Sequence, residues 1–234
     1  METFFKIPFE FNHAALEKRV IETSESDKGY CCFIDSNVLV EAHKKRTSGL
    51  LNILNNATVN SCDGSYIAML VSFLHKKEYK AYSGPNFFNR FINHPVKQCI
   101  IGNTQSVFRK IKNKVEEHNG HSDLHFIPLP FKKVNEFNYA AIAQSINELK
   151  PKYIWVSLGA PKQEIFMSNL LPHLNTGIML GVGAALNYYS GEVKSIPAWA
   201  EKFHLIWFHR ILTEPNKQVG RVLKILINTP KIFI

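Results

Sequence analysis

Two apolar segments in the second half of the chain each end in a turn that is suited to binding an anion. Residues 153–156 are followed by a turn with Gly159 and Pro161, and residues 178–180 are followed by Gly181 and Gly183. Glycine lets the backbone approach a ligand closely, and anions favour helix N-termini beyond the carboxyl ends of strands. The pattern predicts a site for a phosphate-bearing ligand. The alternative is that both glycines serve only the strand-to-helix turns.

The polar cluster after the first of these turns favours the ligand site. Lys162, Gln163 and Glu164 fall in the first turn of a predicted helix. A purely structural helix start favours an acid and has little use for Lys. A cation and a side-chain amide at this place are able to bind a pyrophosphate or a base edge.

Acidic residues follow two further predicted strands, in the first half of the chain. Asp35 begins the run Asp-Ser-Asn after residues 30–34, and Asp63 precedes Gly64 after residues 58–62. Capping of the next helix is the simpler role for Asp35. An acid at a strand end also acts as a general base when it reaches the hydroxyl group to be deprotonated. Asp63 is therefore the leading candidate for a catalytic residue.

The composition indicates a folded protein with an anionic partner. The chain has 234 residues, 45% of them hydrophobic, with a net charge of +9. Nucleic acid, anionic lipid or a phosphate-rich substrate would all suit this charge. The four cysteines and ten histidines lack metal-ligand spacing, so no tightly held metal is predicted, and the cysteines suggest a reduced, intracellular protein. Neither a signal peptide nor a transmembrane helix is expected.

Predicted strands alternate with predicted helices along most of the chain. This order favours an α/β fold with a mostly parallel sheet and helices on both faces. Residues 80–93 are expected to form a loop. We assign residues 1–195 to this domain and residues 196–234 to a C-terminal appendage, in which apolar residues at helical spacing predict a basic amphipathic helix. Packing on the core is its ordinary role, but nearby Trp and basic residues favour an anionic membrane surface.

Several blocks of the sequence resemble the WecG/TagA/CpsF glycosyltransferase family. They are S-L-G-A-P-K-Q-E at 157–164, G-V-G-A-A-L-N at 181–187, G-E-V-K-S-I-P-A-W at 191–199 and R-I-L-T-E-P at 210–215. Upstream, D-S-N at 35–37, C-D-G at 62–64 and I-I-G-N at 100–103 extend the match. Only about the first thirty residues lie outside the resemblance.

The resemblance implies a Rossmann-like fold and an inverting transfer of a sugar, often an N-acetylhexosamine. The implied donor is a UDP-sugar, and the implied acceptor is a polyprenyl-diphosphate-linked saccharide in the synthesis of a bacterial surface polysaccharide. It also implies that the protein is cytoplasmic and lies on the inner face of the cell membrane, with homo-oligomers as a further expectation. Asp63 matches the proposed base of the family, and Asn37 matches a residue that contacts substrate.

Other positions match or depart from the pattern of the family. Asp35 stands where Thr is usual, Asn86 ends a Gly-Pro-Asn in place of Gly-x-Asp, and Lys80 replaces an Arg. The predicted substrate-binding residues are Asp35, Asn37, Gly64, Lys80, Asn86, Gly102, Gly159, Pro161, Lys162, Gln163, Glu164, Gly181, Gly183 and Arg210.

The implied mechanism is one in-line displacement, in which Asp63 takes the proton of the acceptor hydroxyl group as UDP leaves. Cations or helix N-termini must meet the negative charge that develops on UDP. Lys162, Arg210 and a loosely bound divalent ion are alternatives for this role, and no cofactor is required.

Two rival functions rest on weaker patterns. Gly181-x-Gly183 is part of a dinucleotide-binding motif, but Leu186 replaces the third glycine. The positive charge suggests a nucleic-acid-binding protein, but no reader motif accompanies it, so no nucleic-acid partner is predicted. A non-catalytic nucleotide- or nucleic-acid-binding protein remains the alternative.

Overall fold

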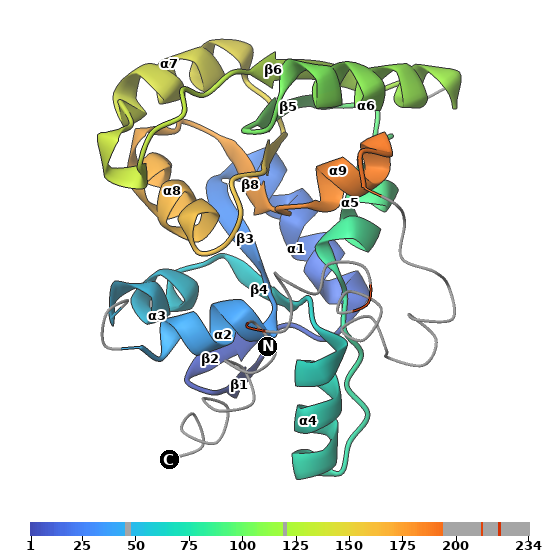
Figure 1. Cartoon of the computed structure of the whole chain (residues 1–234), viewed down its shortest axis with the longest axis vertical. Coiled ribbons are helices and arrows are strands. Elements are labelled where there is room, and N and C mark those ends of the chain that lie inside the picture. Colours follow the sequence, from blue (N-terminus) through green and yellow to red (C-terminus); the bar gives the residue numbers. More distant parts are fainter. Residues whose placement is uncertain (45–47, 119–120, 194–211, 213–219, 221–234) are drawn as a thin grey trace.

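The protein is an α/β fold built on one six-stranded parallel sheet (Figure 1). A computed structural model describes residues 1–44, 48–118 and 121–193, and residues 212 and 220 singly. The strand order is β4-β3-β8-β7-β5-β6. The strands are β3 (Lys28–Ile34), β4 (Val59–Cys62), β5 (Lys97–Ile101), β6 (Asp123–Ile127), β7 (Tyr153–Val156) and β8 (Gly177–Gly181).

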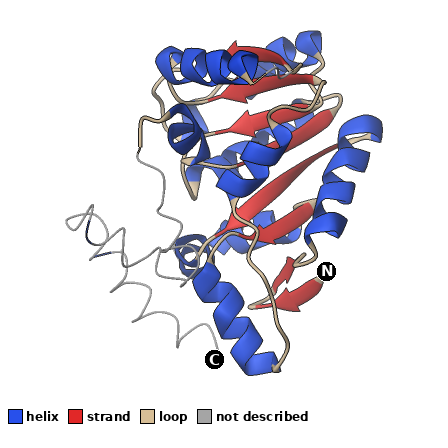
Figure 2. Ribbon diagram, turned by 90° about the vertical axis from the view of Figure 1, so that its right-hand side faces the viewer, coloured by secondary structure: helices blue, strands red, loops and turns tan. Residues whose placement is uncertain are grey.

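Helices cover both faces of the sheet (Figure 2). One face carries α2 (Ser36–Ala42), α3 (Ser48–Asn55), α4 (Ser65–His75), α7 (Tyr139–Leu149) and α8 (Lys162–Leu170). The other carries α1 (His13–Ser26), α5 (Gly84–Phe91), α6 (Gln105–Glu117) and α9 (Ala185–Ser190). Two short 3-10 helices, η2 (Val134–Glu136) and η3 (Leu171–His173), flank α7 and α8. The predicted fold class is confirmed.

The core lies on both sides of the central strands. Every residue of β4, β7 and β8 is buried, as expected for parallel strands that are covered on both faces. Trp155 of β7 is fully buried, and its indole nitrogen donates to Oε1 of Gln98 in β5 at 2.7 Å. This bond satisfies two polar groups that would otherwise be costly to bury.

A small antiparallel hairpin of β1 (Glu2–Phe4) and β2 (Ile7–Phe9) packs beside the sheet. The chain then enters α1, whose N-cap is Asn12, since Oδ1 of Asn12 accepts from the amide of Ala15 at 3.0 Å. The segment between β2 and α1 lies along the edge strand β4, since Glu10 forms a parallel bridge with Ser61.

The prediction of a loop over residues 80–93 was wrong for most of its length, because α5 occupies Gly84–Phe91. Ser83 caps this helix by accepting from the amide of Asn86, and Pro85 stands in the first turn, where proline is tolerated. Three buried phenylalanines of α5 stabilise it against the sheet. The predicted appendage helix lies outside the described residues, and the boundary at residue 195 remains a prediction.

Candidate active site

The predicted site residues follow the carboxyl ends of parallel strands and therefore lie along one edge of the sheet. Ile34, Cys62 and Gly181 end β3, β4 and β8, which are neighbours in the order β4-β3-β8. The helix after β3 lies on one face and the helix after β8 on the other. The point between two such strand ends is where open α/β sheets generally bind ligands.

Asp63 lines a cavity of about 430 Å³ at the end of β4. One carboxylate oxygen accepts from the amide of Gly84 at 2.6 Å, which orients the side chain at the start of α5. The predicted residues Lys80 and Asn86 line the same cavity, together with Ser65, Ala68, Met69, Ser72, Glu78, Tyr79, Ala81 and Ser83. The structure thus brings together the predicted base, a cation and an amide.

Hydrogen bonds to β4 hold one wall of the Asp63 cavity in position. The amide of Tyr82 donates to the carbonyl oxygen of Cys62 at 2.9 Å, and Oγ of Ser61 donates to the carbonyl oxygen of Tyr82 at 2.6 Å. These bonds hold the segment that contains Lys80 next to the carboxyl end of β4. The ammonium of Lys80 lies 3.4 Å from the carboxylate of Glu78, and both side chains are exposed. An exposed pair of this kind is weak and can exchange for a ligand anion.

Asp35 and its neighbours form the next part of the edge. Oδ1 of Asp35 accepts from the amide of Val38 at 2.8 Å, so this residue does cap α2. Gly64 lies beside it, because a Cβ at Gly64 would be 3.8 Å from the Cα atom of Asp35. Asn37 is half-buried in the first turn of α2 and does not line the Asp63 cavity. Its contact with substrate remains a prediction.

A buried polar pair lies under the turn that follows β8. Nε2 of Gln163 donates to the carbonyl oxygen of Gly181 at 2.7 Å and to Oε1 of Glu164 at 3.0 Å. Gln163 is 3% exposed and Glu164 is fully buried. Oε1 of Gln163 and Oε2 of Glu164 accept no hydrogen bond from any described residue. Two such buried acceptors indicate a place for a donor group of water or ligand.

Glycine is required where this pair meets the turn. Gly183 has a φ of +54°, and a Cβ there would be 3.3 Å from Oε1 of Gln163. Burial, together with a smaller effect from the charge of Asp35, raises the pKa of the Glu164 carboxyl group from 4.5 to about 7.

The turns after β5 and β7 are joined by polar side chains. Nδ2 of Asn103 donates to Oδ1 of Asn187 at 2.8 Å and to Oγ of Ser157 at 3.3 Å, and that Oγ donates to the carbonyl oxygen of Gly183 at 2.7 Å. Gly102 has a φ of +77°, and a Cβ there would be 2.7 Å from the carbonyl oxygen of Ser157.

Family comparison identifies the chain. The profile of the glycosyl transferase WecG/TagA/CpsF family matches residues 3–234. The chain belongs to this family. The match includes the first thirty residues, which the resemblance of motifs did not reach.

Three relatives of this WecG/TagA/CpsF family member share the name N-acetylglucosaminyldiphosphoundecaprenol N-acetyl-beta-D-mannosaminyltransferase. The Bacillus subtilis protein is 32% identical over 74 residues, which are 32% of this chain and 29% of the relative. The Bacillus spizizenii protein is 34% identical over 76 residues, 32% of this chain and 30% of the relative. The Staphylococcus aureus protein is 33% identical over 91 residues, 39% of this chain and 35% of the relative. The alignments thus span about a third of each relative's length.

Three predicted site residues of this family member, Gly159, Pro161 and Lys162, do not line the Asp63 cavity. The ammonium of Lys162 donates to the carbonyl oxygen of Lys132 at 2.7 Å and lies over the ring of Phe137, so this side chain is turned toward the loop after β6. Gly159 is exposed with open space around it, and Pro161 follows a cis peptide bond. Arg210 lies outside the described residues.

Reasoning from the sequence missed Asn103, Ser157 and Asn187 as members of the site. Their positions in the sequence could have identified them, because each is a polar residue at the end of a predicted strand or within one of the family motifs given above. Among the described residues no group of three or more His, Cys, Asp or Glu side chains could hold a metal ion. The described helices include none that is long and apolar enough to cross a bilayer.

Proposed function

We propose that this protein transfers a sugar, with inversion, from a UDP-sugar to a polyprenyl-diphosphate-linked saccharide. The observation that carries the proposal is the link between the two halves of the site. Asp63 accepts from the amide of Gly84, and a Cβ at Gly84 would be 3.4 Å from the carbonyl oxygen of Val182. One residue therefore separates the candidate base from the turn of Gly181 and Gly183.

In the proposed reaction the acceptor occupies the Asp63 cavity and the donor binds at the carboxyl end of β8. The acceptor hydroxyl oxygen attacks the anomeric carbon as the bond from that carbon to the diphosphate oxygen breaks. The hydroxyl proton passes to the Asp63 carboxylate, and UDP leaves with the bonding electron pair. A single displacement inverts the configuration of the anomeric carbon.

Several groups of the site suit a nucleotide-sugar. The unpartnered Oε1 of Gln163 can accept from an N–H or hydroxyl group that reaches the turn of Gly183. Lys80 lines the Asp63 cavity, and its exposed pair with Glu78 leaves it able to meet the diphosphate of the acceptor, or that of the donor where the two substrates meet. A divalent ion is an alternative for this charge, and we assign no cofactor.

The names of the relatives support an N-acetylhexosamine as the sugar. Those proteins are named for transfer of N-acetylmannosamine to N-acetylglucosaminyl-diphosphoundecaprenol. By family membership we extend an N-acetylhexosamine donor and a lipid-linked acceptor to this chain. The proposed role is the synthesis of a bacterial surface polysaccharide at the inner face of the cell membrane.

The test is release of UDP from a panel of UDP-sugars, with and without a polyprenyl-diphosphate-saccharide analogue. We expect acceptor-dependent release from one donor, and a loss of about 10²- to 10⁴-fold in Asp63→Asn. Asparagine keeps an oxygen that accepts from Gly84, so the variant should fold. Asp123→Asn is the matched control, because Asp123 starts β6 at the opposite end of the strands.

Two results would contradict the proposal. If no donor releases UDP in the presence of acceptor and lipid, a non-catalytic nucleotide-binding role takes its place. If Asp63→Asn releases UDP as fast as Asp123→Asn, the transferase stands but Asp63 is not its base.

A further inference from the structure

Helix α4 exposes a set of large apolar side chains. Phe73 is 81% exposed, Met69 55% and Leu74 48%. Residues 69 and 73 lie one turn apart on the same side of the helix. The opposite side of α4 packs on the core through Ile67 and Val71. Leu74 lies further round the helix, three residues after Val71, near the C-terminal end. We call Met69, Phe73 and Leu74, which surround this end of the helix, the α4 patch.

The α4 patch begins at the wall of the Asp63 cavity. Ala68, Met69 and Ser72 line this cavity, and Phe73 and Leu74 lie further along the helix. In both views the helix projects from the body of the molecule, with its C-terminal end away from the sheet (Figures 1 and 2). An apolar surface therefore leads outward from the cavity to the end of a protruding helix.

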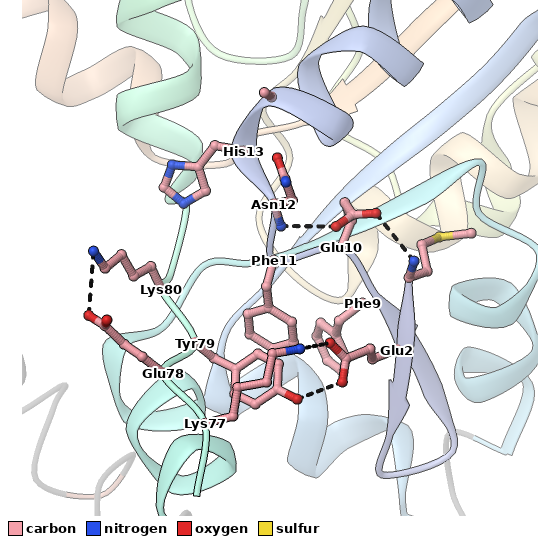
Figure 3. A pocket seen from close by; sticks show the side chains of 12 residues that line it. Glu2, Phe9, Glu10, Phe11, Asn12, His13, Lys77, Glu78, Tyr79 and Lys80 are labelled. Atoms are coloured by element: carbon pink, nitrogen blue, oxygen red, sulfur yellow. Dashed lines mark hydrogen bonds and ion pairs between the residues drawn. The ribbon is translucent and has the colours of Figure 1, made fainter. Parts of the chain in front are cut away.

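The C-terminal end of α4 is anchored to the N-terminal hairpin. The carboxylate of Glu2 accepts from the ammonium of Lys77 at 2.6 Å and from the hydroxyl group of Tyr79 at 2.5 Å (Figure 3). The ring of Phe4 lies 4.8 Å from that of His75 and 5.4 Å from that of Tyr79. These contacts keep the protruding helix in a defined orientation.

Basic side chains surround the end of the α4 patch. Lys76, Lys77 and Lys80 follow the helix and are exposed. Glu2 and Glu78 pair with two of them, so that Lys76 and the general charge of +9 provide the attraction to anions. Apolar side chains next to basic ones are typical of surfaces that bind the interface of an anionic bilayer.

We infer that the α4 patch binds an anionic bilayer and places the mouth of the Asp63 cavity at the level of the lipid headgroups. This inference rests on the proposed function, in which the acceptor diphosphate is anchored in that bilayer. Phe73 and Leu74 enter the interface, and the acceptor reaches Asp63 along the side of α4 that carries Met69.

A bilayer suits the patch better than a protein segment for a geometric reason. Met69 belongs both to the patch and to the cavity wall. A second copy of the chain, or residues 194–234, packed tightly over Met69 and Phe73 would narrow the entrance to the cavity. A fluid lipid surface covers the apolar side chains and still admits a lipid-linked substrate.

The first test is co-sedimentation of the full chain with vesicles of phosphatidylglycerol and phosphatidylcholine. We expect Phe73→Ser to need about tenfold more lipid for half-maximal binding, because it removes one large apolar side chain from the interface. Phe131→Ser is the matched control, since Phe131 is also fully exposed but lies on the loop between β6 and α7. Equal binding of both variants and the wild type would overturn the inference.

The second test places an environment-sensitive fluorophore on Phe73→Cys. Labelling will be selective because Cys31, Cys32, Cys62 and Cys99 are all buried. We expect a blue shift on addition of vesicles and quenching by brominated lipid. The control is Glu116→Cys on α6, at the other end of the molecule from α4 (Figure 1), where no shift is expected.

A blue shift that is already complete without vesicles would overturn the inference, because protein would then cover the patch. Persistence of that shift on dilution would assign the cover to residues 194–234, and its loss would assign it to a second copy. Neither test contains donor or acceptor. A failure of the α4 patch to bind lipid is therefore distinguishable from a failure of the protein to release UDP.

Discussion

Burial of Glu164 should make the stability of the protein depend on pH. Its carboxyl group is fully buried, and this burial raises its pKa from 4.5 to about 7. The folded state therefore holds the proton more tightly than the unfolded state. The stabilisation is complete below pH 4.5 and is lost as the pH rises through about 7. At about 1.36 kcal/mol for each pH unit, this interval corresponds to about 3 kcal/mol.

The perturbation is Glu164→Gln, which keeps the shape of the side chain and an oxygen that accepts from Gln163. Because glutamine does not titrate, the variant should lack this fall in stability. We expect the free energy of unfolding of the wild type, relative to the variant, to drop by about 3 kcal/mol between pH 4.5 and 8. Urea unfolding at a series of pH values measures this difference.

The control for this experiment is Glu116→Gln in α6, whose side chain is 62% exposed. Its difference from the wild type should stay constant over the same pH range. A constant difference for Glu164→Gln as well would refute the reasoning, because it would mean that Glu164 reaches water or a charged partner in the folded protein.

Four substitutions test the candidate site. Gly102→Ala places a Cβ against the carbonyl oxygen of Ser157 at a positive φ, so we expect at least about 1–3 kcal/mol lower stability in urea unfolding. Gly183→Ala crowds Oε1 of Gln163, and we expect KM for the donor to rise more than kcat falls. Unchanged KM would remove this turn from the donor site. Because Lys162 is bound to the loop after β6, Lys162→Met should lower kcat/KM less than Gln163→Met; the reverse order would show that Lys162 turns toward the donor.

Much of the fold could be predicted because it depends on local patterns. Alternation of apolar segments with amphipathic ones indicated a mostly parallel sheet with helices on both faces. The loop prediction failed at α5 because the helix has only eight residues, and its three phenylalanines pack on the sheet rather than follow a long helical pattern. Short helices depend on tertiary packing more than on propensity.

The sequence by itself determined which residues follow strand ends. Asp63, Gly102 and Gly183 could be placed there because turns and glycines are local signals, and parallel strands end at one edge of the sheet. The motifs also indicated the family. None of this required knowledge of which strands are neighbours.

Only the tertiary structure decided how these residues combine. The order β4-β3-β8 brings residues 35, 63 and 183 to adjacent strand ends, although they are far apart in the sequence. The sequence also did not indicate that Gln163 and Glu164 are buried together. Nor did it indicate that the side chain of Lys162 turns toward the loop after β6. Strand order and burial arise from contacts between distant segments, and a local pattern of residue types does not specify them.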